Sequence, residues 1–203
     1  MVWLCLVLPA CAPAATCLDL EALRGTAIAA LPADEPACLT DGKTTLRFET
    51  ATWPALQDQA REVTRIATLD LILSSIDFEP NNADSDETLL FLRDSDGRVY
   101  GFDAGSGRLR VIQPSTGGLP EMGLPLADDA LRATALAYAA SFAPVVLEDE
   151  EKWVYGEGAK APIHFFDWTS TESIVPGQNP RRFQVALWLD GTLFSYMNYT
   201  GDE

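Results

Sequence analysis

Few side chains in this sequence have the type and spacing that catalysis or metal binding requires. His164 is the only histidine, so any catalytic triad or histidine-based metal site would have to use it. It lies between Ile163 and Phe165, which is typical of a strand residue. The chain contains no HExxH, GxSxG, Walker or CxxC motif, which removes the commonest enzyme classes. We therefore expect a protein that is not an enzyme and that uses no cofactor.

The acidic side chains offer two other kinds of chemistry. Asp84, Asp86 and Glu87 lie in a polar loop with hard oxygen ligands of the kind that Ca²⁺ prefers. Their spacing matches no EF-hand, so we predict no metal site and retain these three residues only as the calcium candidates. Two carboxylates across a cleft would equip a secreted hydrolase, but the sequence alone cannot place such a pair. The hydrolase remains an alternative.

The N-terminal residues have features of an export signal. A short apolar run is followed by Ala12, Pro13 and Ala14, the small-x-small pattern that signal peptidase recognises. No Lys or Arg precedes that run, which departs from the usual signal. We expect a signal peptide over residues 1–14, with a lipoprotein signal that places a lipid anchor on Cys11 as the alternative. The mature protein would then be exported, to the periplasm or the extracellular space.

Cys17 and Cys38 remain after either cleavage. Two cysteines in an exported chain usually pair in an oxidising compartment, and their spacing fits neither redox chemistry nor a zinc cluster. We predict a structural disulfide that closes a loop of about 20 residues and stabilises the fold by on the order of 3 kcal/mol.

The charge and composition exclude further classes of function. The formal charge is -16, from 30 acidic and 14 basic side chains, so the chain repels nucleic acids and anionic lipids. With 47% apolar residues it can bury a core. After the signal, no apolar run is long enough to span a membrane.

The elements predicted along the chain divide it into parts. Residues 15–50 form an N-terminal segment stapled by the disulfide, with a short helix and a strand at 44–49. Residues 51–113 form a first α+β unit, with a helix from Thr52 followed by strands that meet at Asp-Gly and Gly-rich turns. In residues 108–111 charged and apolar side chains alternate, which predicts that one face of this sheet is exposed to solvent.

The second half repeats the order of helix and sheet. Residues 114–126 are rich in Pro and Gly and form the candidate linker. Residues 127–203 form a second α+β unit, with a helix over 128–143 and a meander of four strands. The fold class is α+β, with helices packed on antiparallel sheets. The match between the segments that begin at Asp96-Gly97 and Asp190-Gly191 is consistent with two similar helix-plus-sheet units.

The segment VALWLDGTLFSYMNY, with the helix before it, resembles PepSY-type modules, which also occur in front of some secreted metallopeptidases. DGRVYGFDAGSGRLRVI is similar to the closing strands of such a unit, and also to one β-propeller repeat, but a single repeat cannot close a propeller. The resemblance implies an exported, non-enzymatic module of the bacterial cell envelope that binds or restrains a protein partner, for example a peptidase.

Binding is expected on the aromatic residues of the second sheet. Trp168, Trp188 and Tyr196 would form an exposed face that contacts the partner, although burial in the core explains the same residues. A purely structural envelope protein is the remaining alternative.

Overall fold

The structure is a computed structural model of residues 1–203, and it describes residues 17–33, 38–43, 45–48, 51–78, 88–117, 122–172 and 179–201. The expected signal peptide over 1–14, the alternative lipid anchor at Cys11 and the calcium candidates Asp84, Asp86 and Glu87 lie outside the described residues. Within the described part, no helix has the length and apolar character needed to cross a membrane.

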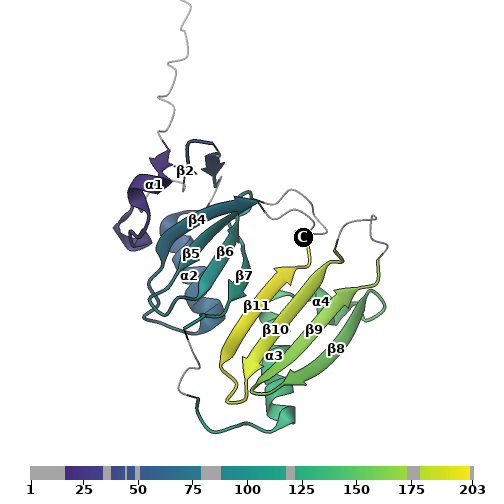
Figure 1. Ribbon diagram of the computed structural model, residues 1–203. Helices are drawn as coiled ribbons and strands as arrows, with labels where there is room; N and C mark the ends of the chain where they lie inside the picture. Colours follow the sequence, from purple (N-terminus) through teal and green to yellow (C-terminus); the bar gives the residue numbers. More distant parts are fainter. Residues whose placement is uncertain are drawn as a thin grey trace, which may run out of the picture.

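The fold is α+β, as the sequence predicts. Eight strands form one antiparallel sheet in the order β4-β5-β6-β7-β11-β10-β9-β8, and α2, α3 and α4 lie on one side of it (Figure 1). The bounds of these elements are α2 (Trp53–Thr64), β4 (Ile72–Phe78), β5 (Thr88–Arg93), β6 (Val99–Asp103), β7 (Leu109–Gln113), α3 (Asp128–Phe142), α4 (Val145–Glu148), β8 (Trp153–Lys160), β9 (Ile163–Ser170), β10 (Arg182–Trp188) and β11 (Leu193–Tyr199).

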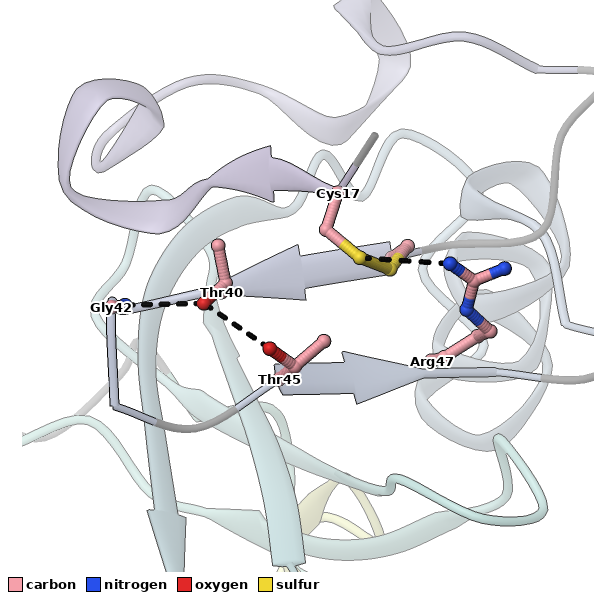
Figure 2. The surroundings of a disulfide bond; sticks show 6 residues. Cys17, Thr40, Gly42, Thr45 and Arg47 are labelled. Carbon is pink, nitrogen blue, oxygen red and sulfur yellow. Dashed lines mark hydrogen bonds between the residues drawn. A yellow bond between two sulfur atoms is a disulfide. The ribbon is translucent and has the colours of Figure 1, made fainter. Parts of the chain in front are cut away.

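A smaller sheet of three strands precedes the large one. Its strand β2 pairs in parallel with β1 and antiparallel with β3. The elements of this segment are β1 (Leu18–Asp19), α1 (Leu20–Leu23), the 3-10 helix η1 (Ile28–Ala30), β2 (Cys38–Thr40) and β3 (Thr45–Arg47). A disulfide joins Cys17 to Cys38, with their Cα atoms 4.8 Å apart, and so ties the start of β1 to β2 (Figure 2).

Each half of the large sheet has four strands, and one or two helices precede these strands in the chain. The first unit is α2 with β4 to β7, and the second unit is α3 and α4 with β8 to β11. The last strands of the two units, β7 and β11, pair antiparallel and make the sheet continuous. The Asp96-Gly97 turn joins the second and third strands of its unit, whereas the Asp190-Gly191 turn joins the third and fourth. The sequence match therefore falls at positions that are not equivalent in the two units.

Both large helices follow the predicted apolar spacing. In α2 the buried face includes Leu56, Ala60 and Val63, and in α3 it includes Leu131 and Ala135. The buried side chains of both helices and of the strands below them form one apolar cluster that runs through the two units. The helices thus stabilise a single core, not two separate ones.

Strand β8 extends beyond the predicted length. The apolar pattern predicts a strand only over residues 153–155, but β8 pairs with β9 from Trp153 to Lys160. Gly156 and Gly158 weaken the strand signal in the sequence, since glycine is depleted in strands. Tertiary pairing with β9 overrides that local preference.

Candidate functional site

A cavity of about 460 Å³ lies where the two units meet, on the helix side of the sheet, and we call it the inter-unit cavity. The residues that line it come from α2, from β7 and the residue before it, from α3 and α4 with the turn between them, and from β11 and the two residues after it: Gln59, Glu62, Val63, Arg108, Leu109, Arg110, Ser141, Phe142, Ala143, Pro144, Val145, Glu148, Tyr196, Asn198, Thr200 and Gly201.

The cavity forms because β7 and β11 pair over a short length only. Their register joins Tyr196 to Ile112 and Met197 to Val111, and it does not continue to Asn198. Residues beyond this point on both strands line the cavity. Pairing joins the units at one point and leaves space beside it.

Arg110 reaches the cavity through an irregularity of β7. The register of β6 and β7 passes from Gly101 and Val111 to Phe102 and Leu109, so Arg110 is the extra residue of a β-bulge. Bulges change the direction of side chains. Arg108 is exposed, as the alternating pattern predicts, but Arg110 is only 2% exposed, so the prediction of a solvent-exposed face is wrong at this position.

Tyr196 lines the cavity and is buried. The residue is 3% exposed, and its oxygen accepts a hydrogen bond from Asn198 Nδ2 at 3.2 Å. Among the described residues, no acceptor for the hydroxyl proton of Tyr196 is found. Burial raises the pKa of Tyr196 well above its usual range, so the group stays a protonated donor at neutral pH.

Neighbouring groups hold the Tyr196 ring in place. Phe142 and Phe183 contact it edge-on, with ring centroids 6.2 and 5.7 Å away. Asn198 also donates to the Phe142 carbonyl at 2.8 Å, and its Oδ1 accepts from the Thr200 backbone and hydroxyl. Asn198 thus positions the tyrosine hydroxyl against the end of α3, so the donor is fixed before a ligand arrives.

The charged lining differs from the rest of the molecule. Arg108 and Arg110 balance Glu62 and Glu148, which makes the lining formally neutral in a chain of charge -16. The cavity therefore does not repel an anionic ligand as the acidic surface would.

All three aromatic residues expected to bind a partner are buried, and two of them, Trp168 and Trp188, do not line the inter-unit cavity. Trp168 is 3% exposed and packs between the rings of Tyr155 and Phe183 in the main core. Trp188 is 6% exposed and packs against Phe194, with their ring centroids 4.9 Å apart. Trp168, Trp188 and Tyr196 thus form no exposed face, because α3 covers one side of the sheet and neighbouring side chains cover Trp188. Tyr196 lines the inter-unit cavity instead.

The remaining predicted residues occupy other parts of the fold. His164 lies in β9 and is 7% exposed, with its Nε2 3.1 Å from Glu157 Oε1. Cys17, joined to Cys38, has its sulfur 3.9 Å from Arg47 Nη2, and Figure 2 shows Arg47 reaching the disulfide from β3. In the described ranges, no group of three or more His, Cys, Asp or Glu side chains could hold a metal ion.

The comparisons with known proteins give one distant structural similarity. No protein-family profile matches the chain, and no curated protein matches it. Among solved structures, the chain is similar to the Bacillus megaterium YpeB C-terminal domain, with a TM-score of 0.47 and 12% sequence identity. The match covers 74% of this chain and 64% of that one, which is less than two thirds of its length. A similarity at this level identifies neither a family nor a function.

Proposed function

We propose that this protein is an exported, PepSY-like binding module of the bacterial cell envelope that is not an enzyme and that holds a segment of a protein partner in the inter-unit cavity. A peptidase is the partner that the sequence resemblance suggests. The disulfide between Cys17 and Cys38 supports the export part of the proposal, since such bonds persist in oxidising compartments.

The observation that carries the binding part is the unused donor of Tyr196. A buried hydroxyl whose proton has no acceptor among the described residues is costly unless a ligand supplies one. A peptide carbonyl or a carboxylate would accept this proton. The size and neutral lining of the cavity suit one or two residues of an extended polypeptide.

Peptide selection followed by calorimetry tests the proposal. A displayed library of random peptides would be selected on the mature protein, and the affinity of the best peptide would be measured for the wild type and for Tyr196→Phe. We expect Tyr196→Phe to weaken binding about tenfold, because the variant keeps the ring and loses one buried hydrogen bond. Tyr138→Phe removes a buried hydroxyl outside the cavity and should bind as the wild type does. Equal affinity of Tyr196→Phe and wild type would refute the site.

Two carboxylates in the same cavity favour the alternative function, a secreted hydrolase. Glu62 and Glu148 both line the cavity, and many hydrolases use a pair of carboxylates for catalysis. Mass spectrometry of the selected peptides after long incubation separates the two functions. Intact peptides support the binding module, whereas cleavage that Glu62→Gln and Glu148→Gln each abolish would support the hydrolase.

A further inference from the structure

The two edges of the eight-stranded sheet differ in how they are covered. Residues 25–28 pair with the start of the β4 edge: Gly25 N–H donates to the Leu73 carbonyl at 3.0 Å, and Leu73 N–H donates to the Thr26 carbonyl at 3.0 Å. Strand β8 forms the opposite edge, and in the described part of the chain it pairs with β9 alone (Figure 1). The start of the β4 edge is therefore covered, whereas the β8 edge is open along its length.

The register shows which backbone groups of β8 point outward. Thr171 N–H donates to the Lys152 carbonyl at 2.8 Å, which makes these two residues a hydrogen-bonded pair. Hydrogen-bonded and non-hydrogen-bonded pairs alternate along an antiparallel ladder, and the register of β8 and β9 is unbroken. The backbone N–H and C=O groups that point away from β9 are therefore those of Trp153, Tyr155, Glu157 and Ala159.

The outer edge of β8 ends in one lysine, Lys160, but it lacks two other features that usually prevent strand pairing. It has no bulge against β9 and no proline within its eight residues. The carboxylate of Glu157 is turned toward the helix layer, where Arg132 donates to it from Nε at 2.9 Å. Val154 and Tyr155 are 59% and 41% exposed. The open edge is therefore long, regular and partly apolar.

Two glycines leave room for side chains of an added strand. Nothing lies within 4 Å of a Cβ placed on Gly156 or Gly158. These glycines border a shallow depression on the face away from the helices, which Phe165 and Gln184 also line. Long side chains of a neighbouring strand commonly cover glycines at an edge.

The charges around the edge select the partner. Glu150 and Glu151 lie just before Lys152 and the start of β8, are exposed and form no ion pair with the described residues, whereas Lys152 is paired with Asp149 at 3.3 Å. Together with the chain's charge of -16, they attract basic side chains and repel a second copy of this chain. We propose that β8 is a docking edge that receives an extended, lysine- or arginine-bearing segment of a partner protein by β-strand addition. This inference is independent of the inter-unit cavity.

Backbone hydrogen exchange tests the docking edge at residue resolution. The probe is a blocked peptide of alternating lysine and valine, about eight residues long to match a strand of ordinary length. At saturation we expect exchange to slow at least tenfold at the amides of Trp153, Tyr155, Glu157 and Ala159. The amides between them already bond to β9 and should change little. Uniform slowing, or none at saturation, would overturn the proposal.

Two variants and two controls sharpen the result. Ala159→Pro removes one outward N–H without removing a bond to β9 and should weaken peptide binding about tenfold, whereas Ala159→Thr keeps that N–H and should bind normally. Glu150→Lys combined with Glu151→Lys should weaken binding of the lysine peptide. Equal binding of a peptide with glutamate in place of lysine would overturn the choice of a basic partner. Dimerisation that protects the same four amides without peptide would also overturn that choice, since a second copy of this chain would then occupy the β8 edge.

Discussion

At the scale of single residues, Glu157 connects the edge strand to the helix layer. Its carboxylate accepts hydrogen bonds from Arg132 Nε and Nη2 at 2.9 and 3.2 Å and from the Tyr155 hydroxyl at 2.9 Å. The hydrogen bond from Arg132 is the main reason why the pKa of Glu157 lies below its usual range. This carboxylate anchors α3 to β8.

The lowered pKa of Glu157 gives a prediction about stability and pH. A carboxyl whose pKa is lower in the folded state stabilises the protein above its unfolded pKa, and that contribution is lost as the pH falls through the folded pKa. We expect Glu157→Gln to lower the melting temperature by about 2–4 °C at pH 7. The difference from the wild type should shrink as the pH falls below about 4, and calorimetric scans across this range measure it. A difference that is constant from pH 7 to pH 3 would contradict the assignment.

A second residue-scale prediction concerns Tyr100 and Asp94. The Tyr100 hydroxyl donates to Asp94 Oδ2 at 2.8 Å, and both residues are buried. Asp94 Oδ1 accepts from the backbones of Asp96 and Arg98, so Asp94 also holds the turn between β5 and β6. Tyr100→Phe leaves a buried carboxylate oxygen without its donor and should cost about 1–3 kcal/mol of unfolding free energy in urea titrations. Tyr138→Phe removes a hydroxyl that donates to no carboxylate among the described residues, so it is the matched control and should cost less than about 1 kcal/mol.

At the scale of elements, the end of the linker is fixed to the second unit. Asp190 Oδ2 accepts from the Gly123 N–H at 2.7 Å, and the Leu126 N–H donates to the Leu189 carbonyl at 2.7 Å. Burial opposes ionisation of Asp190, but the hydrogen bonds from Thr192 and Gly123 together lower its pKa. The turn between β10 and β11 therefore holds the chain that enters α3.

Replacing Asp190 tests this attachment. Asp190→Ala removes the acceptor for the Gly123 N–H, so hydrogen exchange at Gly123 should become at least tenfold faster at pH 7. Exchange at Leu126 should change less, because its carbonyl partner on Leu189 remains. Unchanged exchange at Gly123, measured by nuclear magnetic resonance, would show that Asp190 does not hold the linker.

The elements also show how far sequence reasoning extends. The apolar spacing in α2 and α3 and the Asp-Gly turns predict helices and hairpins because those signals are local. The inter-unit cavity has no such signal, since its lining comes from four separate segments. The alternating pattern predicts that the Arg110 side chain is exposed, but a bulge in β7 changes its direction. The glycines of β8 weaken the strand signal in the sequence, and the strand forms through its pairing with β9. Burial of Trp168 and Trp188 likewise depends on neighbours distant in sequence.

At the scale of the whole molecule, the two units share one core across a narrow join. The backbone ladder between β7 and β11 contains two partner pairs, and one apolar cluster includes buried residues of both units, such as Phe102 and Phe183. Tyr196 contacts Phe142 and Phe183 from the joining strand. Packing, more than backbone pairing, couples the units.

This arrangement predicts that the two units unfold together. Phe102 is fully buried in the first unit, and Phe102→Ala should remove about 3–5 kcal/mol of unfolding free energy. Because the core is shared, native-state hydrogen exchange should show the same loss for the amides of β10 as for those of β5. Phe183→Ala, the reverse case in the second unit, should lower the protection of β5 equally. If β10 keeps its full protection in Phe102→Ala, the units open independently, and the inter-unit cavity would then be a joint between two bodies instead of a site held by one.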